Sequence, residues 1–257
     1  MESAATIWKL ALESWAIPPE ILAQAPELPW IHPPALFGVP DQITETPSHR
    51  IAREALPPGG SVLDIGCGGG VAAMALIPPA IHVIGLDHQS AMLEMFTANA
   101  TKRGATSEVF EGFWPAIAAD VPIADVVTCH HVVYNVADIA PFLSALDKHA
   151  TKRVVIEMPQ HHPHSAHSEA WKYFWNLDRP IVPTPQELLD VLSEIGIVAQ
   201  VEYWDTPLPT DRDLSSATEF TRIRLCLTAD RDPEIRSYLE SQPLPSKREL
   251  ATIWWDK

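Results

Sequence analysis

The glycine-rich segment that begins at residue 66 constrains the fold more than any other part of this sequence. Ser61–Ile65 (SVLDI) is a short apolar run with β-branched residues, and it stops at Gly66–Gly70 (GCGGG), so a strand leading into a turn is expected. A helix should follow from Val71 to Ile77. Glycine at 66 and 68 lets the backbone turn tightly and approach a ligand where a Cβ would collide. The N–H groups of the following helix point into the same place, so this turn is predicted to bind a ligand.

Strands and helices alternate beyond this turn. The further strands expected are Ile81–Asp87, Glu108–Phe110, Ala124–Cys129 and Arg153–Met158, followed by less regular ones at Ala199–Tyr203 and Ala251–Trp255. The helices expected between them are Ser90–Arg103 and a segment capped by Asp138 that ends near His149. Near-continuous apolar strands separated by helices are typical of a parallel sheet covered on both faces. We therefore expect an α/β fold with a mostly parallel sheet, in which the Trp254–Trp255 pair packs in an edge strand.

Residues 1–45 read as an N-terminal extension or lid. One helix fits Ala4–Ala16, and Pro18–Pro19 should stop it. The stretch that follows is rich in proline, and Trp30 and Phe37 are its expected anchors. No motif in this extension indicates a ligand.

Residues 46–257 are expected to form one domain that carries helical insertions near 160–180 and 211–241. Thr46 is an N-cap residue followed by proline at the first helical position. Thr184 opens a capping box, Thr-Pro-Gln-Glu, which also begins a helix. These signals place the start of two helices but indicate no chemistry.

The charge of the chain argues against a nucleic-acid substrate. The formal net charge is −15, from 33 acidic and 18 basic residues, whereas nucleic-acid binding draws on neutralised phosphates. A small-molecule acceptor or a protein partner fits better, and the oligomeric state is not predicted. The longest weakly polar run, Val71–Leu86, is interrupted by Pro78 and Pro79, so no membrane span is expected. Widely spaced cysteines and the lack of a signal-peptide pattern predict a cytoplasmic protein.

The second strand ends in Asp87, an acid that can accept hydrogen bonds from both hydroxyls of a ribose. A nucleoside site of this kind suits NAD or S-adenosylmethionine. The dinucleotide fingerprint wants Gly or Ala where this chain has Val71. Asp64 would repel a pyrophosphate but attract an ammonium or sulfonium group. S-adenosylmethionine is therefore favoured, while a nicotinamide-dependent oxidoreductase and a cofactor-binding protein without transferase activity stay open as alternatives.

The sequence LDIGCGGG followed by GLDHQSAML resembles the cofactor-binding half of class I S-adenosylmethionine-dependent methyltransferases, over about residues 47–157. The resemblance implies a Rossmann-like, doubly wound sheet of seven strands and a methyltransferase activity on O, N or C of a small molecule. It also implies that Asp64, Gly66, Cys67 and Gly68 surround the methionine moiety, that Asp87 holds the ribose, and that His88 and Met92 lie beside the adenosine. Cys129, at the end of the fourth strand, completes this expected set.

One departure from the family pattern concerns the adenine. Many relatives have an Asp after the third strand, but this chain reads Phe110-Glu111-Gly112-Phe113-Trp114. Either Glu111 substitutes for it, or Phe113 or Trp114 stacks on the adenine. The sequence leaves these alternatives open.

The fourth strand leads into His130, His131 and Tyr134, where family members place catalytic side chains. These three are candidates for a general base if the acceptor must lose a proton. Adjacent residues at a strand end point to opposite sides, so one of the two histidines is expected to be structural. A hydrogen-bonded contact with the cofactor is favoured over the role of base for one of them.

A second polar group comprises Glu157 and a run of histidines at His161, His162, His164 and His167. Prolines interrupt the run and its spacing matches no metal-ligand set, so it is expected to line the acceptor pocket and to bind no metal. A nearby stripe, Trp171, Phe174 and Trp175, should pack in a core, with an aromatic wall for a planar acceptor as the alternative.

Overall fold

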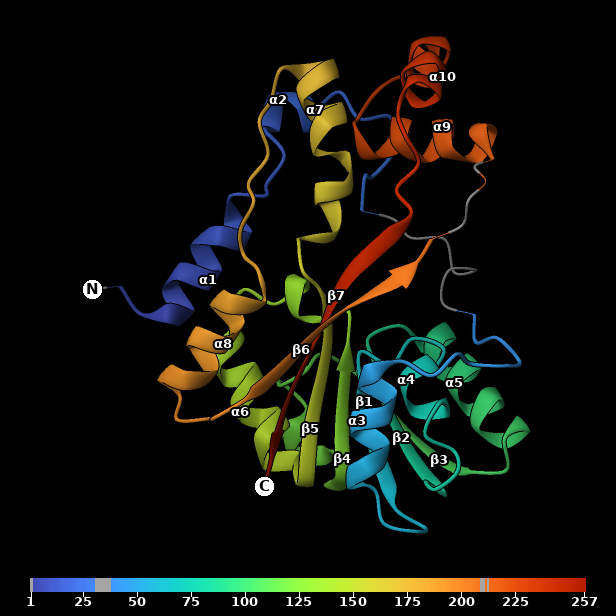
Figure 1. The fold of residues 1–257 in the computed structure, drawn as a ribbon, viewed down its shortest axis with the longest axis vertical. Coiled ribbons are helices and arrows are strands. Elements are labelled where there is room, and N and C mark those ends of the chain that lie inside the picture. Colours follow the sequence, from blue (N-terminus) through green and yellow to red (C-terminus); the bar gives the residue numbers. More distant parts are fainter. Residues whose placement is uncertain (1, 31–37, 209–210, 212) are drawn as a thin grey trace.

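The computed structural model describes residues 2–30, 38–208, 211 and 213–257, so the expected anchor Phe37 lies outside the described residues. Figure 1 shows a sheet flanked by helices, with a smaller group of helices above one end of it. Among the described residues, no helix combines the length and the apolar character that crossing a membrane requires.

A seven-stranded sheet forms the centre of the molecule. Its strands are β1 (Ser61–Ile65), β2 (His82–Asp87), β3 (Thr106–Glu111), β4 (Ala124–His130), β5 (Ala150–Pro159), β6 (Gln200–Pro207) and β7 (Lys247–Asp256). Their order is β3-β2-β1-β4-β5-β7-β6. The pairs among β1 to β5 are parallel, whereas β7 runs antiparallel to both β5 and β6. The order reverses at β1, so the cofactor crevice is expected beyond the carboxyl ends of β1 and β4.

The position of the last strand corrects one expectation. Trp254 and Trp255 belong to β7, which lies between β5 and β6 rather than at the edge. Trp255 is buried, and its indole Nε1 donates to Asp147 Oδ1 at 2.8 Å. The edge strand next to β7 is β6, which was among the least regular segments of the sequence.

Helices cover both faces of the sheet, as expected for a doubly wound fold. The helices of the two faces are α1 (Ala4–Glu13), α3 (Pro47–Ala55), α4 (Val71–Met74), α5 (Ser90–Lys102), α6 (Ile139–His149) and α8 (Pro185–Glu194). Successive strand residues alternate between two apolar cores. Val154 and Ile156 face the core that α1, α6 and α8 cover, while Val155 faces the core of α3, α4 and α5.

The expected helix caps are found at Thr46 and Thr184 but not at Asp138. Thr46 Oγ1 accepts from His49 N at 3.2 Å, and His49 Nδ1 accepts from Thr46 N at 3.3 Å. Glu187 completes the box at Thr184, because its Oε2 accepts from Thr184 N at 2.7 Å. Asp138 precedes α6 without making a side-chain hydrogen bond to it.

The N-terminal extension and both insertions meet in one helical cap. Its helices are α2 (Pro19–Leu22), α7 (Ser168–Trp175), α9 (Leu214–Arg224) and α10 (Asp232–Ser241). They share a third apolar core, made of Ile17, Ile21, Ala170, Trp171, Leu225, Cys226, Leu227 and Ile235. Figure 1 shows this cap above the sheet, at the top of the view. The sequence indicated three separate pieces, whereas the structure assembles them into a unit with its own core.

Candidate functional site

Both the backbone conformation and the side-chain packing of the turn after β1 require glycine. Gly66, Gly68 and Gly70 have φ values of 69°, 51° and 96°, in the left-handed region that favours glycine. A Cβ on Gly66 would lie 2.4 Å from Cγ2 of Val132. The side chain that requires glycine here therefore belongs to the segment after β4, which packs against the turn. The sequence indicated ligand approach as the reason, and the structure adds a packing reason.

Asp64 is buried at the end of β1. Its Oδ1 accepts from Thr128 Oγ1 at 3.0 Å, and its Oδ2 accepts from Ala73 N, in the first turn of α4, at 3.3 Å. Burial raises the pKa of Asp64 to about 7, although these two hydrogen bonds favour the charged form. A cation placed beside Asp64 would stabilise its ionised form.

Asp87, at the end of β2, holds the glycine turn in place. Its Oδ2 accepts from Gly68 N at 3.0 Å, and its Oδ1 accepts from Gln89 N at 3.0 Å. Each carboxylate oxygen has further acceptor capacity. The parallel register pairs Asp64 with Gly85, so the two acids end neighbouring strands at the same edge of the sheet.

The two aromatic candidates after β3, Phe113 and Trp114, lie in different environments. The Phe113 ring is 68% exposed and stacks on the His88 ring, with centroids 5.1 Å apart. Trp114 is buried in the core beneath α6, where its Nε1 donates to Phe142 O at 3.3 Å. The expectation that Trp114 stacks on an adenine is therefore wrong, because its ring is on the core side. Glu111 is exposed and pairs in register with Asp87.

Three other residues of the expected cofactor set are buried. Met92 lies in α5, Cys67 packs in the core beneath α4 and α5, and Cys129 packs in the core beneath α6. Burial raises the pKa of both thiols, so neither is a nucleophile at neutral pH. Because the Cys129 side chain faces the core, any contact of this residue with a ligand would come from its main chain.

His131 forms an ion-pair geometry with Glu157 at the carboxyl ends of β4 and β5. His131 Nε2 lies 2.9 Å from Glu157 Oε1, and His131 N donates to Glu157 O at 2.8 Å. The backbone of His131 has φ 61°, which is uncommon for a residue other than glycine. Its side chain is 41% exposed. His131 is therefore an accessible imidazole oriented by a buried carboxylate.

His130 lies beneath this pair in a different environment. It stacks on the His49 ring at 5.8 Å, its Nδ1 is 4.0 Å from Glu157 Oε2, and its Nε2 has no hydrogen-bond partner among the described residues. Burial lowers the pKa of His130 to about 4, although the charge of Glu157 opposes this. His130 is thus neutral at physiological pH.

Glu157 belongs to this site rather than to the histidine run after it. Burial alone would raise the pKa of Glu157, but His130 and His131 outweigh it and lower the pKa below its ordinary value. The sequence grouped Glu157 with the later histidines. The signal that it missed was the register: Glu157 pairs with His130 across β4 and β5. His49, from α3, was not singled out by the sequence.

Tyr134 does not fit the role of a base. Its hydroxyl donates to Pro159 O at 2.9 Å, and its ring stacks on Trp8 at 5.9 Å. Burial also raises the pKa of Tyr134. The Tyr134 side chain is buried in the apolar core. The expectation that Tyr134 is catalytic is therefore corrected.

The later histidines lie in the cap. His162 stacks on Trp15 at 4.2 Å, and His164 stacks on Trp30 at 5.0 Å. Across the described ranges, the structure holds no group of three or more His, Cys, Asp or Glu side chains placed to bind a metal. Trp171 is buried in the cap core with Phe174 and Trp175 packed against it, which agrees with packing as the role of this stripe.

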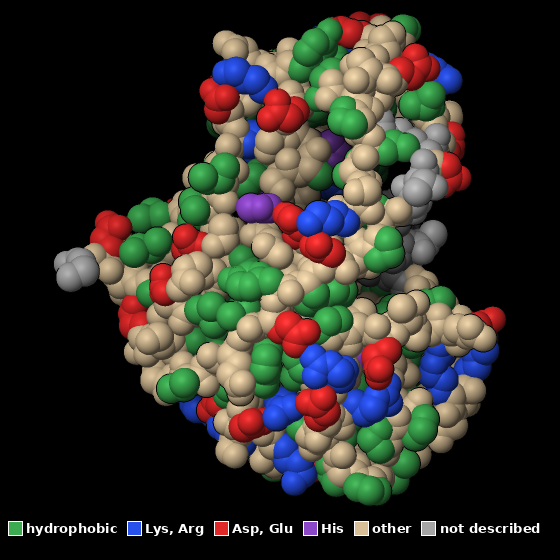
Figure 2. Space-filling model, in the orientation of Figure 1, with side chains coloured by type: hydrophobic (Ala, Val, Ile, Leu, Met, Phe, Trp, Pro, Cys, Tyr) green, Lys and Arg blue, Asp and Glu red, His purple; other side chains and the backbone are tan. Residues whose placement is uncertain are grey.

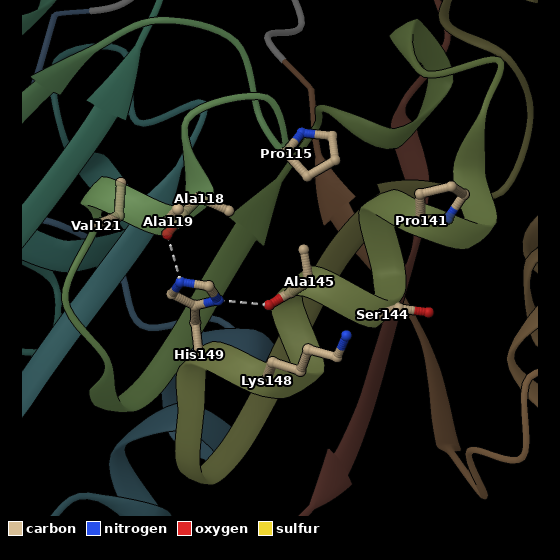
Figure 3. A pocket seen from close by; sticks show the side chains of 9 residues that line it. All are labelled: Pro115, Ala118, Ala119, Val121, Pro141, Ser144, Ala145, Lys148 and His149. Atoms are coloured by element: carbon tan, nitrogen blue, oxygen red, sulfur yellow. Dashed lines mark hydrogen bonds between the residues drawn. The ribbon is translucent and has the colours of Figure 1, made fainter.

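A hollow of about 430 Å³ lies between α6 and the 3₁₀ turn Ala118–Asp120, as Figure 3 shows. Its lining is mainly apolar and includes His149, whose ring nitrogens lie 2.8 Å from Ala145 O and 2.9 Å from Ala118 O. None of the residues discussed above for the glycine turn or for the His131–Glu157 pair lines it. This hollow is therefore separate from the candidate site.

On the face drawn in Figure 2, acidic and basic side chains intermingle over α3 and the strands beside it. Arg50 pairs with Glu54 and Glu202, and Arg153 pairs with Asp256. This face therefore carries no broad patch of one sign.

Known proteins resemble the central part of the chain. Residues 62–152 match the family described as "Methyltransferase domain". A ubiquinone biosynthesis O-methyltransferase from Leptothrix cholodnii is 37% identical over 89 residues, which are 34% of this chain and 38% of that protein. Its counterpart from Hahella chejuensis is 31% identical over 96 residues, 37% of this chain and 40% of that protein. The chain thus spans about two-fifths of the length of these curated relatives.

A solved structure shows the same fold over most of the chain. The YcgJ protein from Bacillus subtilis superposes with a TM-score of 0.56 at 19% identity, covering 82% of this chain and 97% of that one. The matched domain contains the glycine turn, Asp64 and Asp87, and the sheet order agrees with the fold that the sequence indicated. Residues 62–152 therefore match a methyltransferase domain, and the chain has the Rossmann-like fold of the solved structure.

Proposed function

We propose that this chain transfers a methyl group from S-adenosylmethionine to a hydroxyl group of a small molecule, with His131 as the general base. The observation that carries the proposal is the arrangement of four strand ends. Asp64 and Asp87 lie beside the glycine turn at the ends of β1 and β2, and the His131–Glu157 pair lies at the ends of β4 and β5. The names of the curated relatives, O-methyltransferases, favour oxygen as the acceptor atom.

The residues at the glycine turn fit the cofactor chemically. Asp64 would lie close to the ammonium and sulfonium charges, and its raised pKa shows a carboxyl that gains from a nearby cation. Asp87 retains acceptor capacity for ribose hydroxyls. The exposed His88–Phe113 ring pair offers a surface for a purine ring. When bound, S-adenosylmethionine supplies an electrophilic methyl group; the protein supplies position and proton transfer.

His131 is better suited than His130 to accept the acceptor's proton. Its Nε2–H donates to Glu157, which leaves Nδ1 as the acceptor. When Nδ1 takes the hydroxyl proton, the resulting imidazolium is stabilised by the Glu157 carboxylate. His130 is buried with its pKa lowered to about 4, so it stays neutral and supports the pair. This arrangement assigns the two histidines different roles, as the sequence anticipated without choosing between them.

A small molecule is the proposed acceptor because of the charge of the chain. At a net charge of −15, the protein would repel the phosphates of a nucleic acid. The cap lies over the edge of the sheet that carries the site (Figure 1), and Figure 2 shows the surface hollowed between the cap and the sheet domain. The identity of the acceptor would depend on the cap.

Calorimetry with S-adenosylhomocysteine tests the cofactor assignment. We expect binding that Asp64→Asn weakens at least about tenfold, since hydrogen bonds and ion contacts of charged groups contribute roughly 1.5–3 kcal/mol. Asp125→Asn is the matched control, because Asp125 accepts from Ser61 N at 2.9 Å at the opposite end of the sheet. Equal loss in both variants, or no binding near 1 mM (roughly −4 kcal/mol), would refute the assignment.

Activity distinguishes the enzyme from its alternatives. A library of phenols and other hydroxylated small molecules, offered with labelled S-adenosylmethionine, should give a methylated product. Binding of cofactor without any product would favour a protein that binds the cofactor but transfers nothing. Tighter binding of NAD than of S-adenosylhomocysteine would instead favour an oxidoreductase.

A further inference from the structure

A row of polar side chains crosses the sheet beneath the first turn of α3. Glu157 on β5 pairs in register with His130 on β4 and with Thr252 on β7. Residues paired in this way point to the same face of a sheet. Glu157 and Thr252 are 5% and 0% exposed, and burying polar groups is costly unless they form hydrogen bonds. The hydrogen-bond partners of this polar row (His130, Glu157 and Thr252) therefore indicate its role.

The first turn of α3 supplies partners for the polar row. Thr46 Oγ1 donates to Glu157 Oε2 in a long hydrogen bond of 3.4 Å, and the hydroxyl oxygens of Ser48 and Thr252 are 2.6 Å apart. The Ser48 side chain is fully buried, and a hydrogen bond from it helps to lower the pKa of Glu157. Two hydroxyl groups at the start of α3 thus act on the carboxylate that pairs with His131.

The hydrogen bonds that reach Glu157 through Ser48 have a single direction. Trp204 Nε1 donates to Thr252 Oγ1 at 3.0 Å, and an indole N–H can only donate. Glu157 is ionised, because its pKa lies below its ordinary value, and a carboxylate can only accept. Since Ser48 donates its one proton to Glu157, the Thr252 hydroxyl must donate to Ser48. The chain of donors therefore runs from Trp204 through Thr252 and Ser48 to Glu157.

His131 lies at the end of this chain of donors. Its Nε2 is 2.9 Å from Glu157 Oε1. Because Glu157 is an acceptor for the hydroxyl groups of α3, the proton between the two side chains belongs to His131 Nε2, and Nδ1 keeps its lone pair. The hydrogen bonds behind Glu157 thus favour one of the two tautomers of the neutral His131 ring.

Other titratable and charged groups that act on Glu157 are His49 from α3, His130 from β4 and Arg248 from β7. Burial lowers the pKa of both His49 and His130, so their neutral forms are favoured. A charge such as that of Arg248 attracts a carboxylate in many orientations, whereas a hydrogen bond restricts its angle. The orientation of the Glu157 carboxylate therefore depends on its hydrogen bonds.

We propose that Ser48 is a positioning residue: its hydroxyl, held by Thr252, orients Glu157 so that His131 keeps its proton on Nε2 and presents Nδ1 to the hydroxyl of the methyl acceptor. This inference rests on the proposed function, in which the acceptor's proton passes to His131 Nδ1. Ser48 acts through Glu157 and touches none of the reacting atoms. The tautomer of His131 is measurable without an acceptor, so the inference has a test of its own.

Nitrogen NMR of the full chain, labelled with ¹⁵N in its histidine rings, provides that test. The shifts of the two ring nitrogens distinguish the tautomers, and His131→Gln identifies the His131 signals by their loss. We expect His131 of the unmodified protein to be in the Nε2–H form when the ring is neutral. Ser48→Ala should raise the ratio of the Nδ1–H form to the Nε2–H form about tenfold, the effect of losing one hydrogen bond to a charged group.

Variants at position 252 test the chain of donors without changing Ser48. Thr252→Val removes the hydroxyl and keeps a similar shape, so it should change the tautomer ratio in the same direction as Ser48→Ala. Thr252→Ser keeps the hydroxyl and should retain the ratio of the unmodified protein. Thr218→Val is the control, because Thr218 is a buried residue of α9 whose Oγ1 donates to Leu214 O at 2.6 Å.

Three NMR outcomes would overturn the inference. They are an Nδ1–H form of His131 in the unmodified protein, an unchanged ratio in both Ser48→Ala and Thr252→Val, and an equal change in Thr218→Val. If Ser48→Ala proves unfolded by circular dichroism, the contrast between Thr252→Val and Thr252→Ser decides the matter.

Turnover separates this inference from the proposed function. With a phenol that gives a methylated product, Ser48→Ala should lower kcat at least about fivefold, the effect of one hydrogen bond, and change KM less than twofold. An unchanged kcat would overturn the role of Ser48 in the reaction. If no phenol is methylated while the tautomer ratio responds as expected, the proposed function is refuted and the orientation of Glu157 by Ser48 is supported.

Discussion

The carboxyl edge of the sheet holds acidic side chains and the cap holds arginines, and different parts of the chain stabilise these opposite charges. At the edge, Asp87 accepts hydrogen bonds from main-chain N–H groups of the turns that follow β1 and β2, those of Gly68 and Gln89. In the cap, Arg179 reaches across the sequence to carbonyls of the N-terminal extension. The Asp87 contacts therefore span 2 and 19 residues of the sequence, whereas the Arg179 contacts span 163 and 164.

The largest effect is expected in the cap. Trp171→Ala removes a buried indole from the core that α2, α7, α9 and α10 share, and truncation of this kind costs about 3–5 kcal/mol. Hydrogen exchange should show the cap opening while the sheet stays protected, with S-adenosylhomocysteine still bound. A loss of protection spread equally over β1 and β2 would mean that the two regions fold as one unit.

The next effect concerns turnover at the edge. His131→Gln should lower kcat by about 100-fold or more, the range of general base catalysis, with little change in cofactor affinity. Glu157→Gln should lower kcat less and shift its pH profile, because the charge that stabilises the imidazolium is lost. His82→Gln, at the start of β2 where His82 Nδ1 contacts Thr106 Oγ1, is the control. An unchanged kcat in His131→Gln would remove this residue as the base.

Packing within the glycine turn gives the third prediction. Gly66→Ala places a Cβ 2.4 Å from Val132 Cγ2 and should destabilise the fold by about 1–3 kcal/mol, as overpacking does. The double variant Gly66→Ala/Val132→Ala should recover part of this loss in chemical denaturation. The part of the stability loss that the double variant does not recover reflects the cost of placing alanine at the Gly66 φ of 69°. If the double variant recovers no stability, Val132 is not the side chain that requires glycine at position 66.

The pH dependence of cofactor binding is the fourth prediction. Because the pKa of Asp64 is raised to about 7, a bound cation must displace a proton below that pH. Affinity for S-adenosylmethionine should therefore rise from pH 6 to pH 7, by at most about tenfold per pH unit, and level off above. Asp64→Asn should flatten this profile. A rise in affinity on acidification would contradict the predicted direction of the pH dependence.

The smallest effect separates two neighbouring aromatic residues. Phe113→Ala should weaken S-adenosylhomocysteine a few-fold, since ring stacking contributes about 0.5–1.5 kcal/mol. Trp114→Phe should leave that affinity unchanged and lower the melting temperature instead, because Trp114 Nε1 donates to Phe142 O in the core. The reverse pattern would show that the adenine lies on the other side of the loop.

Much of the fold was predictable because its signals are local. The strands and the caps at Thr46 and Thr184 depend on residues a few positions apart, and the glycine turn is recognisable from five consecutive residues, Gly66–Gly70. The side to which Trp114 points and the environment of His130 were not predictable. Both depend on which elements pack over them, α6 for Trp114 and α3 for His130.

Local patterns were enough to predict the sheet, the glycine turn and the two acids that flank it, because strand, turn and helix signals act over short distances. The three-dimensional packing decided which histidine meets Glu157, since that depends on the register of β4 against β5. It also decided that three separate segments form one cap around Arg179. Contacts between distant segments follow from packing and register, which no local pattern encodes.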